Sequence, residues 1–276
     1  MDLEEGIIGL YLKIDAACEM ILRGRRLRGR GPAAGLADAE VITIEVFGEM
    51  VGHHDDAAIW RYFRAHWQAW FPGLQSYSAF AKQCANLGWL KQQILGILFP
   101  ARDGIHITDG VPMPVCLRVR AGRSRCFKGL AAFGYCAAKD MHYYGFKGHL
   151  VINLKQQVVA FTLAPANVDE REVLDNLPGI LHGMLIGDKG LLSQAKQEEL
   201  ARYGIDLQTP LRSNMPDPRP TSWVQCLLRT RRTVETVIGQ LVEYFNFAAC
   251  KARDIWHLTA KLARKLLAYN LALAET

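Results

Sequence analysis

Apolar residues in the first hundred positions recur at helical intervals, and breaking residues separate the runs. Residues 36–52 carry such a pattern and end at Gly52, and residues 55–71 carry another that stops before Pro72. A third run, 76–99, stops before Pro100 and is long enough for one or two helices. The pattern therefore predicts a helical region over residues 1–100.

After Pro100 the pattern of apolar residues changes from helical spacing to short alternating or continuous apolar runs. "GIHITDG" alternates, so Ile105, Ile107 and Asp109 share one face of a strand. Residues 143–165 read as two strands joined by a turn at 155–157, and "GMLIGD" reads as a short buried strand. The remaining patterns predict a helix over 193–204, a strand over 205–211 and helices over 223–245 and 252–274.

This order of elements predicts an α/β fold in which one mixed sheet is flanked by helices. A parallel pair made by the first and fourth strands would bring the ends of those two strands together. We expect two domains: a helical N-terminal domain over residues 1–100, a candidate for binding DNA ends, and a second domain over residues 101–276 that includes the C-terminal helix.

Composition narrows the class of protein. Half of the 276 residues are hydrophobic and 22% are charged, which is enough for a substantial core. No apolar run reaches the roughly 18 residues of a membrane span, and the acidic start "MDLEEG" is unlike a secretory signal. We expect a bacterial cytoplasmic protein with reduced cysteines and no membrane partner.

Charge divides unevenly along the chain. Residues 1–100 carry 10 basic and 11 acidic residues, whereas residues 101–276 carry 23 and 16. Between Arg118 and Lys155, eight basic residues, Lys139 among them, face a single acid, Asp140. Such a segment suits a polyanion such as nucleic acid, and a solvated loop is the alternative.

Two aspartates interrupt apolar patterns where we expect strands to end. Asp109 follows the first strand and Asp188 follows the fourth. A lone carboxylate at such a place is usually a turn former or helix cap. On neighbouring strands, however, two close carboxylates repel unless a cation lies between them, and a divalent metal is the natural partner.

Glu235 is the third candidate acid. On a helix it lies beside the apolar side, three residues before Ile238, where a carboxylate needs a partner. Arg231, four residues earlier, offers an ordinary i,i+4 pair. The alternative is that Glu235 joins Asp109 and Asp188, because three carboxylates can hold two Mg²⁺ ions, as in polymerases and nucleases.

Five stretches carry a family resemblance. "HITDGVPMPVC", "YYGFKGHLVINL", "FTLAPANVDEREVLDNLPG", "LIGDKGLLS" and "RRTVETVIGQL" occur in that order. Together they resemble the DDE-type transposases of bacterial insertion sequences, from about residue 36 to the C-terminus. The resemblance implies an RNase H-like catalytic core over 101–276, with Asp109, Asp188 and Glu235 as catalytic metal ligands.

The same resemblance implies an activity and its partners. Two Mg²⁺ ions, for which Mn²⁺ can substitute, would support cleavage at the transposon ends and transfer of the freed 3′-hydroxyl into target DNA. The double-stranded DNA partners would be the transposon ends and the target, bound by a homo-oligomer that associates with the nucleoid. Positions 228 and 242, where related transposases often carry Tyr and Lys, hold Leu228 and Val242.

Basic residues near these motifs are the candidates for DNA contacts. Lys147 shares a strand face with His149, which reads either as a structural histidine or as a neighbour of the metal ligands. Lys189 would meet a phosphate or pair with a surface acid. The full candidate set is Arg118, Arg120, Arg123, Arg125, Lys128, Lys147, Lys189, Arg231 and Arg232.

Two other functions would also account for some of these residues. Another RNase H-like DNA nuclease, such as a resolvase, would have the same acids but no strand-transfer step. A catalytically decayed remnant would bind DNA without metal and would not nick it.

Overall fold

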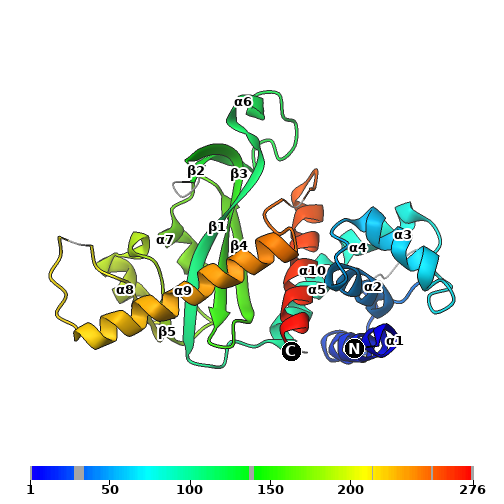
Figure 1. The fold of residues 1–276 in the computed structure, drawn as a ribbon, viewed down its shortest axis with the longest axis horizontal. Coiled ribbons are helices and arrows are strands. Elements are labelled where there is room, and N and C mark those ends of the chain that lie inside the picture. The colour runs from blue at the N-terminus through cyan, green and yellow to red at the C-terminus, as the bar shows by residue number, and fades with distance from the viewer. Residues whose placement is uncertain (1, 28–33, 137–139, 213, 250, 275–276) are drawn as a thin grey trace. The chain divides into compact units, whose positions relative to one another are not determined.

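The computed structural model describes residues 2–27, 34–136, 140–212, 214–249 and 251–274. The chain divides into two compact units (Figure 1). The first contains Met1–Leu98 and Glu243–Thr276, and the second contains Phe99–Val242. No helix among the described residues combines the length and the apolar character needed to cross a bilayer.

Six helices form the described part of the first unit. They are α1 (Leu3–Leu22), α2 (Asp38–Met50), α3 (Asp56–His66), α4 (Tyr77–Asn86), α5 (Gly88–Leu98) and α10 (Ile255–Ala274). The predicted helical region is confirmed, although α1 is absent from the predicted elements. The last helix, predicted within 101–276, packs here against α2 and α5.

The core of the first unit surrounds α2, which is buried on nearly every side. Gly48 permits this, because a Cβ atom there would lie 2.7 Å from Cγ1 of Ile59 on α3. A side chain at this position would push the two helices apart. The helix predicted over residues 36–52 therefore lies in the middle of the unit.

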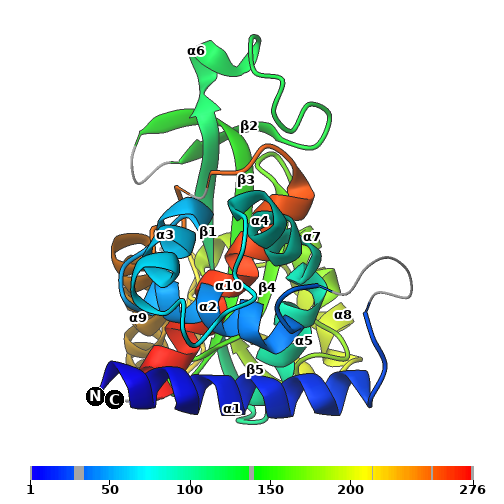
Figure 2. The same cartoon turned by 90° about the vertical axis from the view of Figure 1, so that its right-hand side faces the viewer.

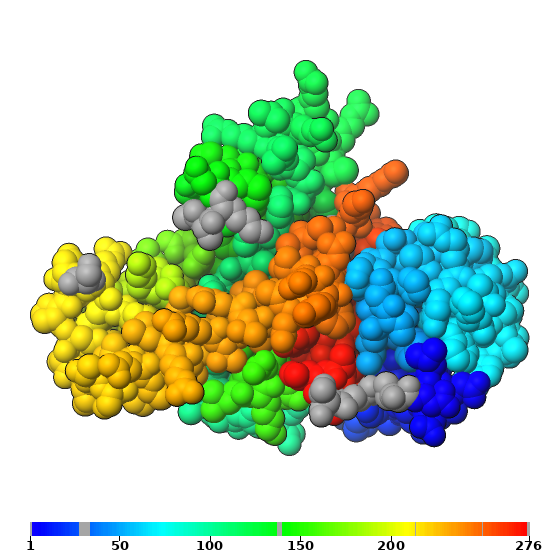
Figure 3. Space-filling model, in the orientation of Figure 1, coloured from blue at the N-terminus to red at the C-terminus, as the bar shows by residue number. Residues whose placement is uncertain are grey.

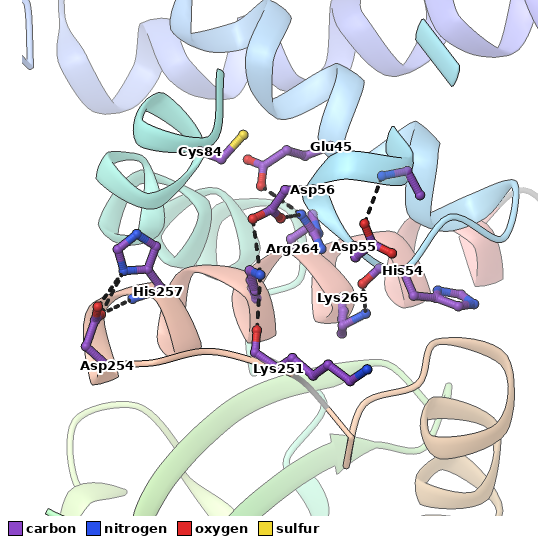
Figure 4. Close-up of polar contacts among 12 residues, drawn as sticks. Glu45, His54, Asp55, Asp56, Cys84, Lys251, Asp254, His257, Arg264 and Lys265 are labelled. Carbon is purple, nitrogen blue, oxygen red and sulfur yellow. Dashed lines mark hydrogen bonds and ion pairs between the residues drawn. The ribbon is translucent and has the colours of Figure 1, made fainter. Parts of the chain in front are cut away.

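Buried ions cross-link the helices of the first unit (Figure 4). Arg264 of α10 is fully buried, and its guanidinium contacts Asp56 at 2.6 Å, Glu49 at 2.8 Å and Glu45 at 3.2 Å. Lys265 is also buried and pairs with Glu49 at 2.8 Å. These two cations of the helix predicted over residues 252–274 face inward because α2 and α3 supply carboxylates.

The second unit is built on one mixed six-stranded sheet. Its strands are β1 (Ile105–Leu117), β2 (Ala132–Cys136), β3 (Met141–Asn153), β4 (Val158–Pro165), β5 (Gly183–Ile186) and β6 (Ile205–Gln208). The strand order is β2-β3-β1-β5-β6. The sixth strand, β4, lies off this path and pairs with β3. β1 and β3 are antiparallel, as are β3 and β4, whereas β1, β5 and β6 are parallel.

Helices cover both faces of this sheet. The long helix α9 (Thr221–Tyr244) crosses one face, and α7 (Glu170–Val173) and α8 (Gln194–Ala201) lie on the other (Figures 1 and 2). Leu185, Leu200 and Leu207 belong to the apolar core on the α8 side. The predicted α/β class, one mixed sheet flanked by helices and preceded by a helical region, is confirmed.

Among the described strands and α-helices of the second unit, α6, α7 and β2 were not predicted. β1 continues to Leu117 and leads into the short helix α6 (Arg118–Ala121), and β2 follows after a further segment. Residues 118–131 carry no alternation, and β2 is only five residues long. The predicted hairpin is confirmed as β3 and β4, whose register joins Phe146 to Pro165 and Ile152 to Val158.

Candidate active site

Asp109 lies within β1, so the expectation that the first strand ends there was wrong. What ends beside it is the neighbouring strand: the parallel pairing of β1 with β5 covers only Ile105–Ile107 and Met184–Ile186. Alternation along β1 places Asp109 on the face of Ile107. Its Oδ1 accepts a hydrogen bond of 2.8 Å from the N–H of Gly110.

Asp188 follows β5 and precedes the 3₁₀ turn Lys189–Leu191. It occupies the N-cap position, but its side chain accepts no capping hydrogen bond there. The turn is closed by its backbone carbonyl, which accepts from the N–H of Leu191 at 2.9 Å. The Asp188 carboxylate therefore does not act as a helix cap and is available for other contacts.

Arg231 of α9 brings the three predicted acids together. Its Nη1 lies 3.8 Å from Oδ2 of Asp109 and 3.6 Å from Oδ1 of Asp188. Its Nη2 donates to Oε1 of Glu235 at 2.6 Å. The i,i+4 pair and the gathering of three carboxylates therefore coexist, with a guanidinium at their centre. Leu227, Val234, Val237 and Leu241 bury the other side of α9.

The three carboxylates differ in exposure and in charge behaviour. The side chain of Asp109 is 24% exposed, against 40% for Asp188 and 50% for Glu235. Burial raises the pKa of Asp109 to about 6, and the charges of Glu170 and Asp188 add to that rise. The Gly110 N–H and Arg231 oppose it. Burial is thus the main reason why Asp109 holds its proton to a higher pH than a free carboxyl does.

Glu170 is a fourth carboxylate that the sequence reasoning missed. A Cβ atom on Gly110 would lie 3.3 Å from its Oε1, and one on Gly190 would lie 4.0 Å from its Oε2 and 3.9 Å from Oδ2 of Asp188. Glu170 approaches from the α7 side of the sheet. Its only sequence signal is the acidic run "DERE", which is typical of an ordinary helix start.

Lys147 and His149 share a strand face as predicted, opposite Gly110 and Pro112. The ammonium of Lys147 lies 2.9 Å from Oε1 of Glu170, so it already has an acidic partner. His149 is buried, and that burial lowers its pKa to about 4, so its ring is neutral. It fits the structural interpretation, although its Nε2 has no hydrogen-bond partner among the described residues.

The remaining basic candidates fall into two places. Lys189 and Arg232 are exposed near the carboxylates, on the turn after β5 and on α9. The other described candidates lie beyond the far end of β1; about 30 Å of extended strand separates Arg118 from Asp109. These are Arg118, Arg120, Arg123, Arg125 and Lys128, all exposed. Lys139 lies outside the described residues.

The donor chemistry of the carboxylates suits a hard divalent cation. Within the part of the chain that the structure describes, however, no three acids, histidines or cysteines lie close enough together to hold a metal. The acids point to a common cation, and in this arrangement that cation is Arg231. The metal site itself stays a prediction.

Comparison with known proteins addresses the family directly. The family model described as a transposase DDE domain matches residues 99–255, which begin where the second unit begins and contain all three acids. No curated protein matches the chain. Among solved structures, the chain is similar to the piggyBac transposase in a synaptic complex with hairpin DNA, at 10% identity and a TM-score of 0.47, over 97% of this chain and 73% of that one. Since the family model matches more than half of the sequence, the chain belongs to the transposase DDE domain family.

Proposed function

We propose that this transposase cleaves DNA at the ends of an insertion sequence and transfers the freed 3′ ends into target DNA. The observation that carries this proposal is the convergence of Asp109, Asp188 and Glu235 on the guanidinium of Arg231. The three acids come from β1, the turn after β5 and α9, far apart in sequence. A packed core alone would not require three carboxylates around one cation.

Asp109, Asp188 and Glu235 are the residues that would hold divalent metal, Mg²⁺ or Mn²⁺. Two such ions, when bound, supply activation of the attacking oxygen and stabilisation of the leaving oxygen. Asp109 is the most buried of the three and is fixed by the N–H of Gly110, so it gives the site its fixed position. Glu235 is half exposed on a helix and can adjust.

The basic residues near the acids would hold the DNA backbone. Lys189 and Arg232 are exposed beside the site and fit phosphate contacts. Arg231 would be available to a phosphate only once it leaves the carboxylates. Joining two ends also requires that at least two active sites act in one complex, so we propose a homo-oligomer on DNA.

A nicking and joining assay tests the function. The substrate is DNA spanning the flanks of this protein's own reading frame, incubated with Mg²⁺ or Mn²⁺. Wild type is compared with Asp188→Asn and with Asp175→Asn, a control that removes an exposed acid paired with Lys196. Nicks at the borders of an inverted repeat, lost only in Asp188→Asn, are expected, and joined products identify strand transfer.

Other outcomes of that assay point to the competing functions. Nicks without joined products would make the protein a nuclease of the same architecture. Metal-independent DNA binding without nicks would make it a decayed transposase, and Asp188 would then be a turn residue only.

A further inference from the structure

We propose that the far end of the sheet in the second unit binds unpaired nucleotides by stacking bases on Phe133 and Tyr135. This end, called the arm below, comprises residues 116–136 and 141–145. The inference rests on the proposed function for its DNA partner. It adds a second binding surface, about 30 Å along β1 from the carboxylates.

The arm exposes two large aromatic rings on one strand. Phe133 is 56% exposed and Tyr135 is 50% exposed. In the register of β2 with β3 they pair with Tyr144 and His142, and their ring centroids lie 5.4 Å and 4.7 Å from those partners. Two pairs of neighbouring rings thus lie on one face of the strands; Tyr144 is half-buried and His142 is exposed.

The opposite face of β2 explains why these rings point outward. A Cβ atom on Gly134 would lie 2.7 Å from Cβ of Ala166 and 3.1 Å from Cζ of Tyr143, so that face is closely packed. Alternation along the strand then leaves Phe133 and Tyr135 no buried position. Side chains this apolar are usually buried unless they serve a contact.

The charge beside these rings identifies the class of partner. The five cations Arg118, Arg120, Arg123, Arg125 and Lys128 are all exposed, and none takes part in an ion pair within the described ranges. Residues 116–136 and 141–145 contain no acid. The neighbouring Asp140 accepts a hydrogen bond of 2.7 Å from the Tyr135 hydroxyl. The arm is therefore strongly cationic.

Cations and rings are held on one element. The hydroxyl of Tyr144 donates to the carbonyl of Phe127 at 3.2 Å, and the Phe127 ring packs edge-on against Phe146 at 5.2 Å. These contacts tie the basic segment to β3. Figures 1 and 3 show α6 and this segment projecting beyond the rest of the sheet, where a long ligand can reach them.

Unpaired nucleic acid is the partner that uses both features. Its phosphates match the cations, and its bases offer π faces that a closed duplex hides. An acidic protein would match the charge but would not need a row of exposed rings. A duplex would contact the cations through its phosphates but would offer no unpaired base to stack on Phe133 or Tyr135.

The test is the ratio of single-strand to duplex affinity, measured with the full chain and 2-aminopurine oligonucleotides of one sequence. The double variant Phe133→Leu, Tyr135→Leu is compared with wild type and with Tyr203→Leu, which removes a ring 59% exposed outside the arm. We expect the double variant to lower the ratio about tenfold or more and to lose quenching of 2-aminopurine. Circular dichroism checks that all three proteins are folded.

An unchanged ratio in the double variant, or an equal fall in Tyr203→Leu, would overturn the stacking proposal. So would polyglutamate that competes as well as single-stranded DNA, because charge alone would then explain binding. The nicking assay separates this failure from a failure of the proposed function. If wild type nicks DNA but its preference for single strands does not depend on Phe133 and Tyr135, only the stacking proposal fails. If wild type neither binds nor nicks DNA, both proposals fail.

Discussion

The guanidinium of Arg231 lies 3.8 Å from the carboxylate of Asp109, on the face of the sheet where the sequence predicts a metal. One cation thus stands among three acids, and burial with the neighbouring charges of Glu170 and Asp188 raises the pKa of Asp109. This relationship makes the site sensitive to pH, to charge removal and to added divalent ions.

Asp109→Asn should stabilise the metal-free protein at neutral pH. Folding raises the pKa of this carboxyl from its ordinary 3.8 to about 6, so the folded state binds the proton more tightly than the unfolded state. Ionised Asp109 therefore lowers the free energy of unfolding, and this loss develops between pH 4 and 6 and is complete above that range. We expect a gain of about 2 kcal/mol above pH 6 that disappears near pH 4.

Chemical denaturation with chelator, at neutral pH and near pH 4, measures this difference. Asp175→Asn, an exposed acid, serves as the control and should change little. A loss of stability in Asp109→Asn at neutral pH would show that the carboxylate is satisfied in the folded protein.

Arg231→Gln should make the metal-free protein depend on added Mg²⁺. Without the guanidinium, three carboxylates repel one another, and we expect the free energy of unfolding to fall by about 1 kcal/mol. Mg²⁺ should then raise the melting temperature of the variant more than that of wild type, because no bound cation has to be displaced. Thermal unfolding with chelator and with Mg²⁺ measures both effects.

The neighbouring Arg232→Gln is the matched control, since Arg232 is exposed on the same helix. Equal responses of all three proteins to Mg²⁺ would mean that Arg231 and the metal do not share a site.

Arg264→Met should strongly destabilise the first unit. The fully buried guanidinium holds Glu45, Glu49 and Asp56. Removing it takes away the cation that all three share, and each carboxylate keeps a single lysine partner, Lys91, Lys265 or Lys261. Breaking a buried pair in this way costs about 3–5 kcal/mol, whereas loss of an exposed pair costs less than about 1 kcal/mol. Arg171→Met, which removes a cation paired with Asp169 at the surface, is the exposed comparison.

Denaturant unfolding of both variants measures the contrast, and Arg264→Lys should recover part of the loss because it keeps the charge. If Arg264→Met is as stable as wild type, water or a rearranged Lys265 must replace the guanidinium, and the ion cluster is not a structural requirement.

The main sheet was predictable because local signals and pairing rules agree there. Alternation in "GIHITDG" and the apolar run before Asp188 predicted both acids at the ends of neighbouring strands. β1 runs on past Asp109, but its parallel pairing with β5 still brings the two acids together. The four-residue spacing of Arg231 and Glu235 predicted the ion pair between them. Its contacts with Asp109 and Asp188 depend on how α9 crosses the sheet, which spacing does not encode.

Other features depend on partners distant in sequence. From the sequence, Arg264 and Lys265 look like surface cations. Their acidic partners lie on α2 and α3, more than 200 residues earlier in the chain, so no local pattern reveals them. Glu170 looks like a helix cap, because its approach to Gly110 and Gly190 requires the folded sheet. Strand β2 alternates small and aromatic residues over only five positions, too few to predict a strand.

Gly183→Ala should destabilise the strand that carries Asp188. Gly183 begins β5 with φ +83°, and a Cβ atom there would collide with the carbonyl of Gly104. Gly179 has the same φ of +83° but nothing within 4 Å, so Gly179→Ala isolates the backbone strain, which costs about 1 kcal/mol. We expect Gly183→Ala to lose at least about 2 kcal/mol more, because a backbone carbonyl cannot move aside cheaply. Paired denaturation curves measure the difference; equal losses would mean that β5 shifts to accept the methyl group, and nicking by Gly183→Ala would then report whether Asp188 moved with it.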